Sequence, residues 1–200
     1  MAKDDNIQGG QMIAYFAVAV IAISLFVIGA RLTGFDVLTD TAEVNVTISP
    51  LAAINFTTDF IDFGTGTVLL GAANAMLESN GTAAVNGTWS WTAQYFELEN
   101  IGNINVSLKL KSGKTAAQVL GGSSPSYEYV VRDTESGSCI DIPAGWQTAT
   151  GSDATICSSF KIKDSNDRIR IDVKLVIPSD SNSGTGGFTD TFTATGTAGA

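Results

Sequence analysis

The chain has 200 residues, of which 44% are hydrophobic, and 20 Asp and Glu against 11 Lys and Arg give it a net charge of −9. This acidic balance argues against nucleic acid as a partner, because binding to a phosphate backbone depends on Lys and Arg. Histidine is absent, which removes Ser-His-Asp and Cys-His catalysis and most zinc sites, so we expect no enzyme, no cofactor and no metal site.

The first predicted element is a hydrophobic helix at residues 12–30, which follows a short N-terminal segment at residues 1–11. Its nineteen residues carry no charge, and as a helix they span about 28 Å, close to the thickness of a bilayer core. A cleaved signal peptide is one alternative, but its apolar region is usually shorter and follows a basic start. A buried helix of a soluble protein is another, although the rest of the chain is strand-like. We predict a retained transmembrane or filament-core helix.

The charges that follow this helix predict which side of the membrane the rest of the chain occupies. No Lys or Arg occurs between Leu32 and Leu108, whereas eight acidic residues do. Cytoplasmic flanks of membrane helices are rich in Lys and Arg, so a long stretch without them is typical of a segment that is translocated across the membrane. After a connector at residues 31–41, residues 42–200 are therefore predicted to form an extracellular domain at the cell surface, with residues 1–11 inside.

Acceptor triplets for N-linked glycans support an external domain. The sequence N-x-[S/T] occurs at Asn45, Asn55, Asn80, Asn86 and Asn105, and none has Pro at the middle position. Each triplet alone is a weak signal in a chain rich in Ser, Thr and Asn. Together with the missing positive charge, they favour a glycoprotein domain outside the cell.

The domain at residues 42–200 is predicted to be all-β, because apolar and polar residues alternate with a period of two. The first strand is expected at residues 42–48, where Val44, Val46 and Ile48 share one face, and the clearest one at residues 168–177. Further strands are predicted near residues 54–63, 89–98, 106–110, 127–132 and 188–197, with a loop at 71–87 and one helical turn at 114–120. About seven or eight short strands predict an antiparallel two-sheet sandwich, immunoglobulin-like or jelly-roll-like.

The two cysteines, Cys139 and Cys157, are the only ones in the chain. They form neither a CxxC pair nor a metal cluster, and their even number suits one disulfide in an oxidising compartment. Two free buried thiols are the alternative. A disulfide here would pin the loop between them, which is rich in Gly, Thr and Asp.

Two segments of the domain resemble a known family. FELENIGNINVSLKLK at residues 96–111 and FTDTFTATGTA at residues 188–198 look like the paired strand signatures of camelysin/TasA-type secreted sandwiches, whose members include fibre-forming subunits. The N-terminus also resembles that of archaeal type IV pilins, whose apolar helix packs into a filament core, with Gly9-Gly10 at the place of a processing site. The resemblance implies a surface subunit whose partner is another copy of itself.

The remaining candidates for chemistry are carboxylates and aromatic residues. Asp59 with Asp62, and Asp164 with Asp167, are pairs close in sequence, but turn and strand-end roles are the simpler interpretation. The pattern Asp180-x-Asn182-x-Gly184 is similar to part of a calcium loop, without its terminal Glu. Four aromatic residues are expected to pack in the core, with a surface for stacking on sugars as the alternative: Trp89, Trp91, Tyr95 and Phe96.

The leading functional hypothesis is a structural subunit of a filament, pilus or coat. A monomeric binding module such as an adhesin is the second, and a membrane-tethered hydrolase with two carboxylates is the third. Outward basic residues are expected either to meet the acidic first half of a neighbouring copy or to pair across strands within one domain. These residues are Lys109, Lys111, Arg168, Arg170 and Lys174.

Assembly is predicted to use strand addition. A strand joined by a flexible linker can complete its own sheet or that of a neighbour, since the backbone hydrogen bonds are the same. Two segments qualify, residues 42–48 after the connector and residues 188–197 after a Gly- and Ser-rich linker at residues 178–187. Closure within one chain is favoured where no neighbour is held close.

Overall fold

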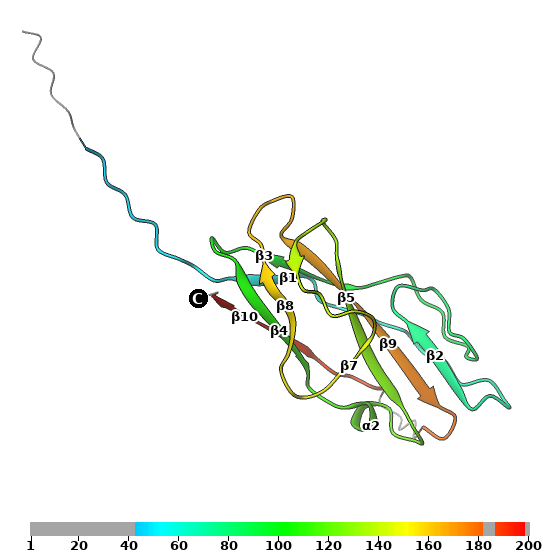
Figure 1. The fold of residues 1–200 in the computed structure, drawn as a ribbon. Coiled ribbons are helices and arrows are strands. Elements are labelled where there is room, and N and C mark those ends of the chain that lie inside the picture. Colours follow the sequence, from blue (N-terminus) through cyan, green and yellow to red (C-terminus); the bar gives the residue numbers. More distant parts are fainter. Residues whose placement is uncertain (1–42, 182–186, 199–200) are drawn as a thin grey trace, which may run out of the picture. The chain divides into compact units, whose positions relative to one another are not determined.

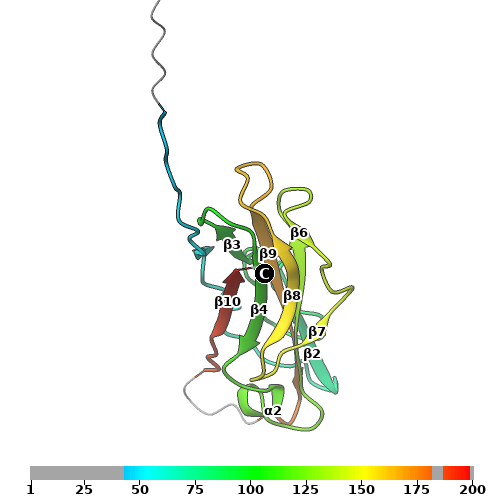
Figure 2. The same cartoon turned by 60° about the vertical axis from the view of Figure 1, so that its left-hand side comes forward.

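The computed structural model describes residues 43–181 and 187–198. The predicted helix at residues 12–30 and its flanks at 1–11 and 31–41 lie outside these ranges. From Ile48 onward the chain forms one compact unit, called the body below. Among the described residues, no helix has the length and apolar character needed to span a membrane. Two antiparallel β-sheets build the body (Figures 1 and 2), so the prediction of an all-β domain with two antiparallel sheets is confirmed for this part of the chain.

The first sheet has six strands, arranged around one long central strand. Its order is β1-β3-β9-β5-β7, and β2 also pairs with β9. The strands are β1 (Ile54–Thr58), β2 (Asn74–Glu78), β3 (Phe96–Asn100), β5 (Ser126–Asp133), β7 (Gln147–Thr148) and β9 (Arg168–Pro178). Along the edge of β9 that faces away from β5, β3 pairs with residues 168–171 and β2 with residues 174–178. These two strands therefore lie at opposite ends of β9.

The second sheet has four strands in the order β10-β4-β8-β6. They are β4 (Val106–Ser112), β6 (Cys139–Ile140), β8 (Ala154–Phe160) and β10 (Phe192–Ala198), and one helical turn, α2 (Ala116–Val119), follows β4 as predicted. In β4 the apolar residues Val106, Leu108 and Leu110 are buried, while Lys109 between them is exposed. The alternation in sequence thus separates a core face from a solvent face.

The inner faces of the two sheets share one hydrophobic core. Ile169, Ile171 and Val173 supply it from β9, and Leu98 from β3. Edge-to-face aromatic contacts join the sheets, because Phe192 of β10 lies 5.5 Å from Tyr127 and 5.9 Å from Tyr129 between ring centroids. Such pairs add stability beyond the apolar area that they bury.

Three sequence predictions of local structure are wrong. Residues 43–53 belong to no strand, so the strand expected at residues 42–48 is not formed within the described part of this chain. The segment at 71–87, predicted as a loop, contains β2. Trp89 and Trp91 lie in a segment with one isolated bridge at Ser90 rather than in a bulged strand. Alternation shows only that a segment suits a strand, whereas a distant partner decides whether it pairs.

On the side of the body formed by β6 and β7, the chain connects the two sheets and a disulfide lies next to the connection. The chain passes from β6 in the second sheet to β7 in the first, and the predicted disulfide between Cys139 and Cys157 holds β6 to β8. The cysteines are 18 residues apart in sequence, and both are buried. The link therefore restricts a loop that would otherwise gain freedom on unfolding.

Replacing both cysteines by serine is expected to lower the free energy of unfolding by about 3 kcal/mol, because a loop of this size regains its freedom in the unfolded chain. Urea unfolding of the oxidised protein, the reduced protein and the double variant measures the effect. Reduction should destabilise the unaltered chain and leave the double variant unchanged. Equal stability of all three would contradict a structural role for the link.

Candidate self-association edge

On the side of the body opposite the disulfide, two strands each lack an outer partner among the described residues. β1 pairs only with β3, and β10 pairs only with β4, over all seven of its residues. The two strands approach each other closely, since a Cβ added at Gly196 of β10 would lie 3.2 Å from Ile54 Cγ2 of β1. Both sheets therefore end on one side, which we call the open side.

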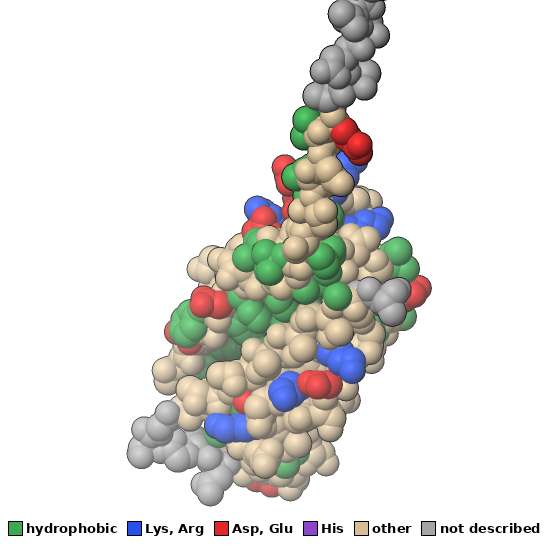
Figure 3. Space-filling model, turned by 90° about the vertical axis from the view of Figure 1, so that its left-hand side faces the viewer, with side chains coloured by type: hydrophobic (Ala, Val, Ile, Leu, Met, Phe, Trp, Pro, Cys, Tyr) green, Lys and Arg blue, Asp and Glu red, His purple; other side chains and the backbone are tan. Residues whose placement is uncertain are grey.

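The aromatic core reaches the surface at the open side. Phe96 lies between Phe56 of β1 and Phe192 of β10, with ring centroids 6.0 Å and 5.7 Å away. These rings are only half-buried, as are Ile54 and the small residue Ala194. The face turned to the viewer in Figure 3 carries a band of hydrophobic side chains, with basic and acidic side chains beside it. Unpaired backbone groups next to apolar side chains can accept an added strand.

The segment that precedes the body alternates apolar and polar residues like a strand, but it pairs with no other described strand. Val44, Val46 and Ile48 are 91%, 80% and 78% exposed and alternate with the polar residues Asn45 and Thr47. Exposure of three aliphatic side chains to water is unfavourable. The segment therefore has an apolar face that no described residue buries.

The chain enters the body at the turn between β3 and β4. The Leu51 backbone N–H donates to Asn103 Oδ1 at 2.6 Å, and Asn103 Nδ2 donates to the Ser49 carbonyl at 2.9 Å. The same turn is fixed to the second sheet, because the buried Asn100 Nδ2 donates to the Phe160 carbonyl at 3.1 Å. The entry point is thus placed at the Arg168 end of β9.

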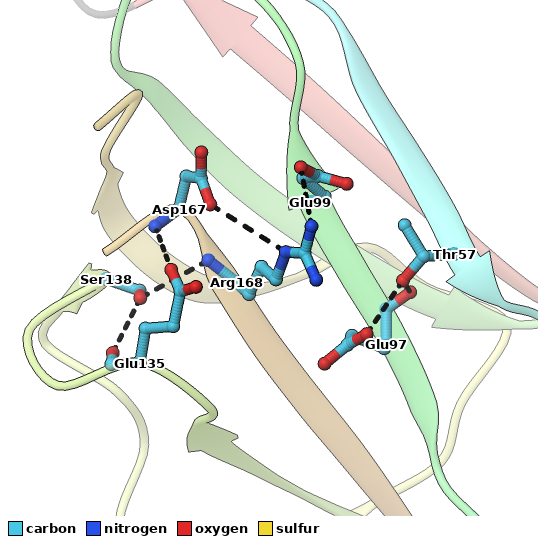
Figure 4. Close-up of polar contacts among 7 residues, drawn as sticks. All are labelled: Thr57, Glu97, Glu99, Glu135, Ser138, Asp167 and Arg168. Carbon is cyan, nitrogen blue, oxygen red and sulfur yellow. Dashed lines mark hydrogen bonds and ion pairs between the residues drawn. The ribbon is translucent and has the colours of Figure 1, made fainter. Parts of the chain in front are cut away.

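A cluster of carboxylates surrounds this end of β9 (Figure 4). The Asp167 backbone N–H donates to Glu135 Oε2 at 3.0 Å, and Arg168 Nη2 donates to Glu99 Oε1 at 3.1 Å. Burial raises the pKa of Asp167, and the nearby charges of Glu135 and Glu99 raise it further, while Arg168 opposes them. The cluster ties the loop after β5 to the start of β9, so its role is to hold the fold together.

The other predicted carboxylate sites take part in turns. Asp62 Oδ1 accepts the Gly64 N–H at 2.7 Å, and Asp180 Oδ1 accepts the Ser123 N–H at 2.9 Å. The hydrogen bonds from Ser123 also lower the pKa of Asp180. Asp59 and Asp164 are exposed, while Asn182 and Gly184 lie outside the described residues. Within residues 43–181 and 187–198, no group of His, Cys, Asp and Glu side chains is suited to a metal ion.

The four aromatic residues considered as a sugar platform have separate environments. Trp91 is buried and packs edge-to-face on Phe63, with centroids 5.0 Å apart. Trp89 and Phe96 are half-buried against the core. Tyr95 lies under the guanidinium of Arg170, whose Cζ is 5.7 Å from the ring centroid. Core packing therefore accounts for three of them, and a cation–π contact for the fourth.

The five predicted glycan acceptors are all exposed. Asn45 lies in the segment before the body and Asn55 in the edge strand β1. Asn80, Asn86 and Asn105 lie in turns and connections, and Asn86 has a positive φ of 58°. Exposure makes each side chain accessible to a modifying enzyme, so all five stay candidates.

Most of the outward basic residues pair with acids of the same chain. Arg168 pairs with Glu99 on β3, and Lys174 is in contact with Glu128 on β5. Arg170 Nε lies 3.6 Å from the buried Asp172 of the same strand, and Lys111 Nζ is 3.9 Å from Asp153, just before β8. Four of the five thus pair within the domain, and two of these pairs, those of Arg168 and Lys174, are the predicted cross-strand kind. Lys109 has no ion pair among the described residues.

The open side and the exposed segment before it are the surfaces best suited to a partner. No family model, curated protein or solved structure matches this chain. Its function is therefore inferred from these surfaces and from the environments of the candidate residues.

Replacing Asp167 by Asn is expected to flatten the dependence of stability on pH. Because the pKa of Asp167 is raised in the folded state, its contribution is fully present below the unfolded value of about 4 and is lost as pH rises through the folded value. Thermal unfolding between mildly acidic and neutral pH measures this loss. Asp164→Asn, at an exposed position, is the control and should keep the wild-type profile. A wild-type profile for Asp167→Asn would contradict the assignment.

Proposed function

We propose that this protein is a structural subunit of the cell surface that associates with copies of itself into a filament, pilus or coat. In this proposal the body is an immunoglobulin-like or jelly-roll-like sandwich outside the cell, and residues 12–30 anchor it in the membrane or the filament core. The observation that carries the proposal is the exposed, alternating segment Val44–Ile48 in a chain whose body has an open side.

Strand addition would bury the apolar face of the N-terminal segment and pair an edge strand of the open side at the same time. An incoming strand gains backbone hydrogen bonds from the unpaired edge of β1 or β10, and its alternate side chains pack on the half-buried aromatic residues of the open side. Burying one Val or Ile side chain stabilises by about 1.5–3 kcal/mol. The face that carries Asn45 and Thr47 would point to solvent, which leaves the acceptor at Asn45 free to carry a glycan.

The N-terminal segment is the better donor of the two that the sequence predicts. β10 pairs with β4 in its own chain along its whole length, and Phe192 contacts three aromatic rings of the first sheet. Removing β10 would therefore break an established core, whereas the exposed segment at residues 43–48 would lose nothing. Anchoring by residues 12–30 would also raise the concentration of neighbouring copies and favour pairing between chains.

Replacing Val46 by Asp in the full-length protein is expected to abolish assembly, because a charge would enter the apolar side of the added strand. Ser49→Asp is the matched control, since it places the same charge on the polar face of the segment and keeps the acceptor triplet at Asn45, which Thr47 completes. Both residues are exposed in the monomer, so both variants should fold like the wild type. Electron microscopy of cell surfaces and sedimentation of isolated assemblies measure the outcome.

Wild-type assembly by the Val46→Asp variant would overturn N-terminal donation. Wild-type protein that stays monomeric at every salt and protein concentration would overturn self-association itself, and would favour a binding module, for which a glycan array is the direct test. When Val46→Asp protein is mixed with wild type, it should shorten the assemblies, because it can accept a strand but cannot donate one.

A further inference from the structure

The outer face of the first sheet carries two arginines directly opposite each other. Arg132 of β5 pairs in register with Arg170 of β9, and both side chains point away from the core that contains their neighbours Val131 and Ile171. Like charges in opposite positions on one face destabilise a sheet. Sheet formation alone therefore does not account for this pair.

A buried carboxylate holds one side of the two guanidiniums. Asp172 lies on the same outer face but is 0% exposed, and its Oδ2 is 3.2 Å from Arg132 Nε and 3.6 Å from Arg170 Nε. The side chains of the two arginines remain 48% and 36% exposed. Asp172 thus contacts the Nε side of both guanidiniums and leaves the rest of each accessible to solvent.

The terminal donors of both arginines have no partner in the described part of the chain. Neither residue donates a hydrogen bond from an Nη atom to a described residue, and Arg170 Nε makes no hydrogen bond there either. By contrast, Arg168, the third arginine of this sheet, bonds with Glu99 through Nη2. A guanidinium has five N–H donors, so the arginine pair has more donors than the single carboxylate of Asp172 can satisfy.

The basic residue at another outward position of β9 differs, because acidic residues lie on both sides of it. Lys174 is in contact with Glu128 of β5 and lies opposite Glu78 of β2. Its charge is therefore balanced within the body. Arg132 and Arg170 are the residues of this face whose cationic donors lack acceptors among the described residues.

Glu97 of β3 lies opposite Arg170 in register but is directed to another partner. Its Oε2 accepts a hydrogen bond from Thr57 Oγ1 at 3.0 Å (Figure 4), and no ion pair joins it to a described Lys or Arg. The guanidinium of Arg170 lies instead over the ring of Tyr95 and beside Asp172, with its Cζ 5.7 Å from the ring centroid. Glu97 therefore leaves the donors of Arg170 unoccupied.

Two half-buried aromatic residues border the arginine pair. Tyr95 comes directly before β3 and Trp146 directly before β7, and these strands are the neighbours of β9 and β5 in the sheet. Val130 of β5 lies opposite Asp172 and is only 4% exposed, and Lys174 Nζ is 4.6 Å from the ring centroid of Trp146. Because Tyr and Trp combine an apolar ring with a polar group, these positions are suited to pack against a sugar ring.

Stability alone does not explain the cluster. Asp172 Oδ1 is buried and has no hydrogen-bond partner among the described residues, and an unsatisfied buried acceptor is costly. Replacing a buried ion cluster by apolar residues is often neutral or stabilising. An arrangement that brings two arginines together at such a cost is therefore better explained by binding.

The donors and the strand order together indicate the class of ligand. The planar fork of Arg matches a planar carboxylate and binds it through paired hydrogen bonds. Both β5 and β9 have a neighbour on each edge, so no free backbone edge is present beside the arginines, and peptides that add to sheets need one. Recognition by side chains alone suits a sugar that carries a carboxylate.

We propose that Arg132 and Arg170 bind the carboxylate of a uronic acid in an acidic polysaccharide, with Tyr95 beside the sugar ring. The site lies on the outer face of the first sheet, away from the unpaired edges of the open side. This binding activity is separate from the proposed self-association and does not depend on it. In an assembly, it would attach each subunit to the polysaccharide that surrounds the cell.

Equilibrium binding of the full-length protein in detergent to a short oligogalacturonate tests the site, with calorimetry as the measurement. The methyl ester of the same oligosaccharide is the matched ligand control, because it keeps the sugar rings and removes only the charge. Arg132→Gln and Arg170→Gln should each weaken binding by about tenfold or more, since a hydrogen bond to a charged group is lost. Lys109→Gln, which removes the same charge from the second sheet, should bind like the wild type.

Arg132→Lys separates the loss of the donor fork from any loss of the fold. It keeps a positive charge next to the buried Asp172, but it cannot bind a carboxylate through two parallel hydrogen bonds. Thermal unfolding checks that the variant is folded, and its affinity for oligogalacturonate should still fall. Wild-type affinity in the folded Arg132→Lys and Arg170→Gln variants would overturn the proposal.

The other outcomes also decide. Absence of binding to oligogalacturonate, or equal binding to its methyl ester, would overturn the uronic acid site and leave the proposed self-association intact, since electron microscopy tests that separately. An oligoglutamate peptide that binds as tightly as oligogalacturonate, and loses affinity in the same arginine variants, would show that the arginines bind protein carboxylates and would overturn the assignment to sugar.

Discussion

The backbone pairing of β9 is the constraint on which the rest of the body depends. One edge of this strand is taken by β5, while β3 and β2 follow each other along the other edge. Buried Ser79 fills the gap between them, since its N–H donates to the Val173 carbonyl at 2.8 Å and its Oγ accepts the Val173 N–H at 2.9 Å. The ladder of β9 is thereby continuous, and no buried backbone group is left unpaired at Val173.

The unequal sides of the body follow from this arrangement. On one side, the chain itself crosses between the sheets from β6 to β7, and a disulfide holds β6 to its neighbour β8. On the other side, β1 is the last neighbour of β3 and β10 is the last neighbour of β4, so within residues 43–181 and 187–198 both sheets end with backbone groups that no strand pairs. Natural proteins usually protect such edges with charges, bulges or coverings. Here Phe56, Phe96 and Phe192 lie half-buried beside them, which makes the edge favourable for a specific partner.

The sequence predicts the elements whose signal is local. Alternation over residues 168–177 gives the faces of β9 correctly, and Val106, Leu108 and Leu110 do the same for β4. The same pattern at Val44, Val46 and Ile48 predicts a strand that has no partner in the described chain, because pairing depends on residues far away in sequence. The open side could not be predicted, since edge status follows from strand order. The disulfide was predictable because each cysteine has only one other cysteine to pair with in this sequence.

The position of β9 late in the chain has a consequence for biosynthesis. Every strand of the first sheet except β7 contacts β9 directly or through β3, yet residues 168–178 follow all of these strands in the sequence. Pairings between such distant segments form slowly, because closing a large loop costs entropy before any favourable contact is made. A nascent chain would thus hold β1 to β8 without a finished sheet. In the proposed export of this domain through a translocation channel, this delay would keep the polypeptide unfolded until β9 has been made.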